Sequence, residues 1–285
     1  MQNIFNFSAG PAMLPPEVMK QAQEEFIDWQ GSGTSVMEVS HRGKPFIDVA
    51  EQAEADLREL LQIPCNYTVL FMHGGGRGQF SAVPLNISKP TDLSQHLVTG
   101  QWSVSAEEEA QKYCKTKILA KSQEVDGKIS VPAQDEWAIE EEAGYFHYCT
   151  NETVDGVEID WVPKSKSGKV PIVADMSSNI LSKPLNVEDY GVIYAGAQKN
   201  IGPSGLSVVI VRNDLVGNAR SYTPAIFDYQ LQAKGGSMYN TPPTFSWYLA
   251  GLVFKWLKAK GGLSQIASLN LQKSNALYQQ IDATG

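Results

Sequence analysis

The chain has 285 residues, of which 42% are hydrophobic and 19% are charged, and its formal net charge is −8 at pH 7. This composition is typical of a folded globular protein with one principal domain. The negative charge argues against a nucleic-acid partner or an anionic membrane surface, because both are bound mainly through clustered Lys and Arg.

Hydrophobic patterns along the chain alternate between helical and extended types. From residue 46 to residue 61, apolar side chains recur at a 3.6-residue spacing, which predicts an amphipathic helix ending before Pro64. Runs rich in β-branched and aromatic residues then predict buried strands at residues 68–72, 96–99, 145–149, 171–174 and 192–195. A second amphipathic helix is predicted over residues 245–257. The alternation predicts an α/β fold with ligands bound at the carboxyl ends of the strands.

A glycine-rich segment, HGGGRGQ at residues 73–79, follows the first predicted strand. Its backbone amides and the start of a following helix could cradle a phosphate, although a flexible glycine turn explains the motif equally well. The segment matches neither the dinucleotide fingerprint nor a P-loop. An esterase oxyanion loop would need a Gly-x-Ser-x-Gly elbow, which the sequence lacks.

Two further candidates follow predicted strands. Trp102 could stack on a cofactor ring, but a tryptophan in this position is more often part of a core or an interface. Thr153 could donate its hydroxyl to a ring oxygen, or it could serve the turn that leads to Gly156. Neither residue decides the function by itself.

Asp175 and Lys199 suggest a more specific chemistry. Asp175 closes an apolar run and could hold a pyridine nitrogen protonated, or it could be a helix cap or a solvated acid. Lys199 follows the small residues Ala195-Gly-Ala, which let other groups approach closely. That setting suits a lysine that forms a Schiff base, although a lone lysine after a strand usually faces solvent.

Other classes of site lack support in the sequence. Cys65, Cys114 and Cys149 form no Cys-x-x-Cys pair, and the four histidines show no metal-ligand spacing, so we predict no disulfide framework and no metal. Residues 1–10 lack the features of a signal peptide, and Lys255 interrupts the most apolar helical segment. We therefore expect a cytoplasmic protein that does not enter a membrane.

Several longer segments resemble one family in content and order. They are FNFSAGP at residues 5–11, GSGTSVMEVSHRG at 31–43, HGGGRGQ at 73–79, AGAQKNIGP at 195–203 and YNTPP at 239–243. With these segments the chain resembles the phosphoserine aminotransferases, which are class V transaminases of fold type I that use pyridoxal phosphate (PLP). The likeness extends from Phe5 to the last residues.

The resemblance implies a fold-type I large domain, in which helices sandwich a mostly parallel seven-stranded sheet. It implies an N-terminal arm over residues 1–15, a PLP-binding large domain over 16–261, and a linking helix with the start of a small domain over 262–285. Family members continue further, so we expect that the stop at Gly285 truncates the C-terminal small domain. The arginine that binds the substrate α-carboxylate would lie in the absent part.

The resemblance also implies a role for each candidate residue. Lys199 would hold PLP as a Schiff base, Asp175 would pair with the ring nitrogen, and Trp102 would stack on the ring. Thr153 would bind the ring hydroxyl. The cofactor phosphate would be held by Gly76, Arg77 and Gln198, together with Asn240 and Thr241 from the partner subunit of a homodimer. The substrate phosphate would lie near His41, Arg42 and Arg77.

The implied reaction transfers the amino group of glutamate to 3-phosphohydroxypyruvate, which gives O-phosphoserine and 2-oxoglutarate in serine biosynthesis. The phosphohydroxythreonine step of vitamin B6 synthesis is also compatible with the resemblance. Alternatives are another class V aminotransferase, a desulfurase, for which no cysteine has an evident catalytic role, and a truncated form that binds PLP and dimerises without turnover.

Overall fold

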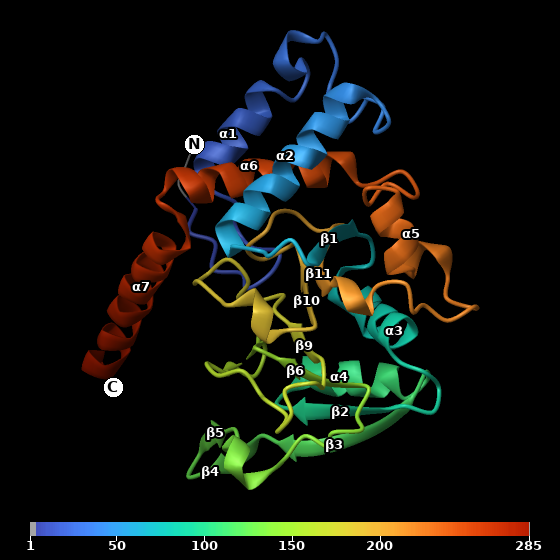
Figure 1. The fold of residues 1–285 in the computed structure, drawn as a ribbon. Helices are drawn as coiled ribbons and strands as arrows, with labels where there is room; N and C mark the ends of the chain where they lie inside the picture. The colour runs from blue at the N-terminus through green and yellow to red at the C-terminus, as the bar shows by residue number, and fades with distance from the viewer. Residues whose placement is uncertain (1–3, 285) are drawn as a thin grey trace.

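A computed structural model describes residues 4–284 and contains a seven-stranded sheet as its central layer (Figure 1). The strand order is β1 (Tyr67–Met72), β11 (Ser207–Arg212), β10 (Val192–Gly196), β9 (Ile172–Asp175), β6 (Tyr145–Cys149), β2 (Leu93–Val98) and β3 (Lys115–Lys121). All neighbouring pairs are parallel except those of β11, which runs antiparallel to both β1 and β10. The predicted mostly parallel sheet is confirmed.

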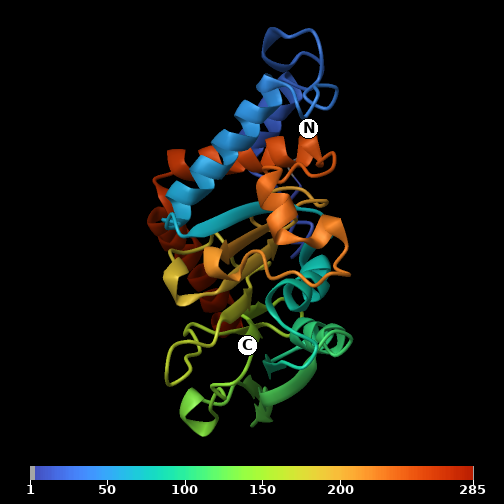
Figure 2. The same ribbon diagram turned by 45° about the vertical axis from the view of Figure 1, so that its right-hand side comes forward.

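Helices cover both faces of this sheet (Figure 2). One face carries α1 (Pro16–Glu24), α2 (Lys44–Leu61) and α6 (Thr244–Ala259), and the other carries α3 (Gly75–Ile87), α4 (Gln101–Ala110) and α5 (Tyr229–Lys234). The two predicted amphipathic helices are thus α2 and α6, and they pack against each other. On this face, Trp247 of α6 stacks on Phe71 of β1 with a ring-centroid distance of 4.5 Å.

The structure adds elements that the sequence patterns had not indicated. Strands β3 and β11 belong to the main sheet, and two small hairpins consist of β4 (Gln123–Val125) with β5 (Lys128–Ser130) and β7 (Asn151–Glu152) with β8 (Val157–Glu158). Short 3₁₀ helices cover Trp29–Gly31, Gln134–Glu136, Val187–Asp189, Asn213–Leu215 and Ala225–Phe227. The β7–β8 hairpin matters for the site, because it carries Thr153 in its turn.

Helix α7 (Gly262–Thr284) extends away from the rest of the chain (Figure 1). Only Leu263 and Ile266 near its start are buried, and the apolar side chains of Leu271, Leu277 and Tyr278 are exposed. The assignment of this helix to a linker between two domains stays a prediction. Within residues 4–284 no helix has the length and apolar character needed to cross a membrane.

The direction of the strands determines where the site lies. β1, β2, β6, β9 and β10 all run the same way, so their carboxyl ends lie at one edge of the sheet. Five of the predicted site segments lie at the ends of these strands, namely those with Gly76 and Arg77, with Trp102, with Thr153, with Asp175, and with Gln198 and Lys199. The fold therefore brings together segments that are far apart in the sequence.

Candidate active site

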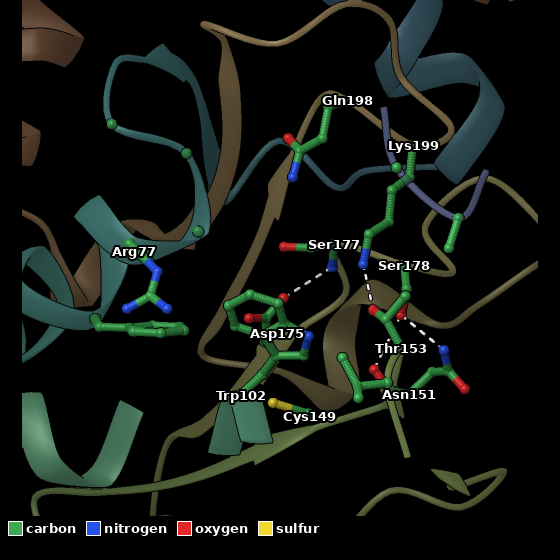
Figure 3. A pocket seen from close by; sticks show the side chains of 17 residues that line it. Arg77, Trp102, Cys149, Asn151, Thr153, Asp175, Ser177, Ser178, Gln198 and Lys199 are labelled. Carbon is green, nitrogen blue, oxygen red and sulfur yellow. Dashed lines mark hydrogen bonds between the residues drawn. The ribbon is translucent and has the colours of Figure 1, made fainter. Parts of the chain in front are cut away.

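A cavity of about 490 Å³ opens at this edge of the sheet (Figure 3). Its volume lies in the range that small-molecule and cofactor sites usually have. Seven residues singled out from the sequence line it together, namely Gly76, Arg77, Trp102, Thr153, Asp175, Gln198 and Lys199. Residues whose roles were ambiguous when each was considered alone in the sequence thus line the same cavity.

Lys199 reaches into the cavity from the loop after β10. Its Nζ donates a hydrogen bond to Oγ1 of Thr153 (Figure 3). Burial lowers the pKa of Lys199 because it disfavours the ammonium form, and this effect exceeds the opposite influence of the Asp175 carboxylate. The N-terminal arm confines the stem of the side chain, since a Cβ on Gly10 would lie 3.0 Å from Cγ of Lys199. The geometry provides a partly desolvated amine with a restricted position.

Asp175 ends β9 at the base of the cavity, with 7% of its surface exposed. Its Oδ1 accepts a hydrogen bond from the backbone N–H of Ser177 at 2.8 Å, and burial raises the pKa of its carboxyl group. Among the described residues no Lys or Arg forms an ion pair with it. A buried carboxylate without a cationic partner fits a site that receives a protonated ring nitrogen.

Trp102 and Arg77 form one wall of the cavity. Trp102 is the second residue of α4, and its buried Nε1 has no hydrogen-bond partner among the described residues. The Arg77 guanidinium lies 5.3 Å from the centroid of the Trp102 ring, within the range of a cation–π interaction. The structure therefore gives Arg77 a contact that its place in the glycine-rich motif did not suggest.

The glycine loop is shaped to receive an anion. Gly74 and Gly75 have φ values of 91° and 61°, which favour glycine, and α3 begins at Gly75. The first N–H groups of α3 have no partner within the helix, and the residues that carry them, Gly75, Gly76 and Arg77, line the cavity. At Gly76 a Cβ would lie 3.2 Å from the Ser177 hydroxyl, so a side chain there would crowd the cavity. The loop fits the phosphate group of the predicted cofactor.

Four of the predicted residues are not brought to this cavity. In the described part of the chain, His41, Arg42, Asn240 and Thr241 are absent from its lining. Nδ2 of Asn240 instead lies 3.1 Å from Nε2 of His73, the residue before the glycine loop. His41 and Arg42 lie in the turn before α2. Their predicted phosphate contacts stay predictions.

The glycine loop also contributes Gly74 and Gly75 to the lining, and the cavity contains residues to which the sequence analysis gave no role, namely Ala9, Gly10, Phe80, Cys149, Asn151, Val154, Ser177 and Ser178. Ser177 contributes most to the geometry, because its hydroxyl accepts a hydrogen bond from the N–H of Gly196 at 3.0 Å while its own N–H binds Asp175. The rule that selected Asp175, a polar residue after a buried strand, would also have found Ser177. No local pattern distinguishes Gly10.

The lowered pKa of Lys199 has a measurable consequence. In cofactor-free protein, we expect an amine-reactive reagent to modify Lys199 at lower pH than the same lysine in a synthetic peptide of residues 195–203, because burial favours the neutral amine. Asp175→Asn should move the profile further down, since the carboxylate opposes the shift. Peptide mass spectrometry after labelling over a pH series measures both. Coincident profiles for protein and peptide would contradict the prediction.

Comparisons with known proteins identify similar chains and one matching family. The family model for aminotransferase class-V matches residues 4–285. The chain is 41% identical to the phosphoserine aminotransferase from Bacillus circulans subsp. alkalophilus, with a TM-score of 0.93 over 97% of this chain and 76% of that one. It is also 41% identical to the PLP-bound phosphoserine aminotransferase from Trichomonas vaginalis, with a TM-score of 0.92 over 99% and 82% of the two chains. An aspartate aminotransferase from Thermus thermophilus shares the fold at 19% identity, with a TM-score of 0.79 over 97% and 76% of the two chains.

Proposed function

Because the chain belongs to the class-V aminotransferase family and is a PLP-dependent transaminase, we propose that it transfers the amino group of glutamate to 3-phosphohydroxypyruvate. The products would be O-phosphoserine and 2-oxoglutarate, which places the enzyme in serine biosynthesis. The observation that carries this proposal is the 41% identity to two phosphoserine aminotransferases over nearly the whole chain. The shared cavity of Lys199, Asp175 and Trp102 supports the transaminase chemistry.

Asp175 and Lys199 would act directly on the cofactor and the substrate. When bound, PLP supplies an electron sink that stabilises negative charge on the substrate α-carbon. Asp175 would keep the ring nitrogen protonated with its buried carboxylate. Lys199 would hold the cofactor covalently through Nζ, and its amine, once free, would move the proton at the substrate α-carbon as a general acid and base.

The remaining residues would orient the ring and the phosphate. Trp102 offers its ring as a stacking surface, and Thr153 offers the hydroxyl that contacts Lys199. The first turn of α3 with Gly76 and Arg77, together with Gln198, would bind the cofactor phosphate. These groups come from four separate segments of the chain, so together they would fix the position of the cofactor.

The proposal includes a homodimer with a shared site. Asn240 and Thr241 would bind the cofactor phosphate, and His41 and Arg42 the substrate phosphate. Since these four residues do not line the described cavity of their own chain, they would have to reach the site of a second copy or change position. An arginine is suited to the task, because its planar guanidinium can bind a phosphate through two hydrogen bonds.

Substrate specificity tests the proposed reaction. With glutamate as amino donor, we expect kcat/KM for 3-phosphohydroxypyruvate to exceed that for pyruvate or glyoxylate by about 10²-fold or more, because charge-assisted hydrogen bonds to a phosphate each contribute roughly 1.5–3 kcal/mol. A phosphohydroxythreonine-type substrate belongs in the same series, to test the vitamin B6 step.

The variant Arg42→Ala should lose most of the preference for the phosphorylated substrate while its activity on pyruvate changes little. Arg212→Ala serves as the matched control, because Arg212 pairs with Asp214 at the surface and lies outside the cavity lining. Equal activity of the unchanged protein on all three oxo acids would argue for a different class V aminotransferase.

A further inference from the structure

The β7–β8 hairpin contains a carboxylate that the reaction does not use directly. Glu152 is fully buried, with 0% of its surface exposed, and its side chain crosses to the first turn of α4. Oε2 accepts a hydrogen bond from the N–H of Trp102 at 3.0 Å. Oε1 accepts hydrogen bonds from the N–H of Ser103 at 2.8 Å and from its hydroxyl at 2.5 Å. The carboxylate thus satisfies three donors at one helix end.

The same hairpin makes a second contact with this helix. Oδ2 of Asp155 accepts a hydrogen bond from the N–H of Gln101 at 2.9 Å. Gly100, the residue before α4, has no room for a side chain, because a Cβ there would lie 2.2 Å from Oδ2 of Asp155 and 2.8 Å from Cγ of Glu152. The hairpin therefore packs directly on the helix N-terminus. There, two carboxylates accept hydrogen bonds from N–H groups that have no partner within the helix and lie at the positive end of its dipole.

These bonds join two segments that each carry a residue of the active-site cavity. Thr153 follows Glu152 in the chain, and Trp102 itself donates one of the bonds. Both Thr153 and Trp102 line the cavity, one from the hairpin turn and one from α4. If both are to contact one cofactor ring, their separation must be held closely, because a functional site tolerates displacements of only roughly 0.5 Å.

The geometry points to Glu152 as a positioning residue that fixes the Trp102 indole relative to the Thr153 hydroxyl. This inference rests on the proposed roles of those two residues toward PLP. Glu152 contacts neither substrate nor cofactor in this assignment. It acts through the backbone N–H of Trp102 and through its own chain neighbour Thr153, in the way that outer residues orient metal ligands in other sites.

Glu152→Gln tests the assignment at the cofactor itself. The glutamine keeps the length of the side chain but loses the charge and turns one acceptor into an NH₂ group, which would face an N–H donor. We expect the dissociation constant for PLP, measured by equilibrium dialysis without substrate, to rise about 10- to 100-fold. The circular dichroism of the bound cofactor should also change, because that signal reports how the ring is held.

The alternative is that Glu152 only caps a helix and stabilises the fold. Asp228→Asn is the matched control, because Asp228 accepts hydrogen bonds from two N–H groups at the start of α5 and lies outside the cavity lining. We expect both variants to lower the midpoint of thermal unfolding, but only Glu152→Gln to weaken PLP binding and alter the dichroism. Unchanged PLP affinity and dichroism in Glu152→Gln would overturn the positioning role.

A second variant keeps the test decisive if Glu152→Gln does not fold. Ser103→Ala removes one donor to Oε1 and leaves the carboxylate with its two backbone bonds. It also removes the acceptor of the Thr99 and Gly100 N–H groups. A smaller rise in the PLP dissociation constant, in the same direction, is expected, and no rise would count against the assignment. The experiment distinguishes failure of the proposed function from failure of this inference. If the unchanged protein does not bind PLP, the proposed cofactor roles are wrong. If the variants bind PLP normally, only the positioning role of Glu152 is wrong.

Discussion

Lys199→Met should reduce amino transfer by roughly 10³-fold or more, since the side chain would serve both as the covalent attachment point and as the proton carrier. Methionine keeps an aliphatic stem of similar length to pack against Gly10, so the loss would report the amine and not the packing. Steady-state turnover with glutamate and 3-phosphohydroxypyruvate measures the effect. No other lysine lines the described cavity, so no neighbouring amine is available to replace it.

The matched control is Lys89→Met, which makes the same chemical change at an exposed lysine outside the cavity lining and should leave turnover unchanged. Borohydride reduction of the PLP-loaded protein adds a structural readout, because it should fix the cofactor on a peptide that contains Lys199. A modified peptide from elsewhere in the chain, or turnover of Lys199→Met within tenfold of the unchanged protein, would refute the assignment.

Asp175→Asn should lower kcat by about 10²- to 10³-fold, the range found when one preorganised electrostatic contact is removed from an active site. Asparagine retains an oxygen that can accept the bond from the Ser177 N–H, so the local geometry should persist. What disappears is the negative charge that would keep the ring nitrogen protonated. Turnover and the absorbance spectrum of the loaded variant measure this loss.

The same substitution should have the opposite effect on the cofactor-free fold. Burial raises the pKa of Asp175 above its unfolded value, so the folded state disfavours the charged form, and the penalty develops as the pH rises through the folded-state pKa. At pH 7 Asp175→Asn should therefore unfold at an equal or higher urea concentration than the unchanged protein. The difference should vanish below about pH 4, where the acid is protonated in both states.

Asp56→Asn is the control for this pair of measurements. Asp56 is also buried, with 2% of its surface exposed, but it lies on α2 outside the cavity lining and pairs with Lys258 at 2.8 Å. Removing its charge should lower stability and leave turnover per folded molecule unchanged, the reverse of the pattern expected for Asp175. If Asp175→Asn instead lost stability and kept its activity, Asp175 would be a structural residue.

Local patterns were sufficient to identify much of this site. The glycine loop, Asp175 and Lys199 each follow a predicted strand, and a strand end is recognisable from its apolar run and the polar or small residues after it. Each residue also had an ordinary structural interpretation, and the resemblance in five segments favoured the catalytic one. The class-V family match and the seven-stranded sheet confirm the predicted fold and cofactor.

Other features of the site required long-range packing. Gly10 near the N-terminus approaches Lys199, and Arg77 of α3 lies over the ring of Trp102 of α4. The contact between Glu152 and α4 joins residues 50 positions apart. No periodicity or short motif in the sequence predicts these long-range contacts, because they depend on which strands become neighbours and in which direction each strand runs.

The sequence by itself therefore determined the chemistry, since an amine, a carboxylate and a glycine-lined turn are properties of residue types and of local conformation. Tertiary structure alone decided that these groups share one cavity and that His41, Arg42, Asn240 and Thr241 lie outside its lining within the described chain. The physical reason is that strand order and helix docking follow from burying apolar faces across the whole domain, which a local stretch of residues does not specify.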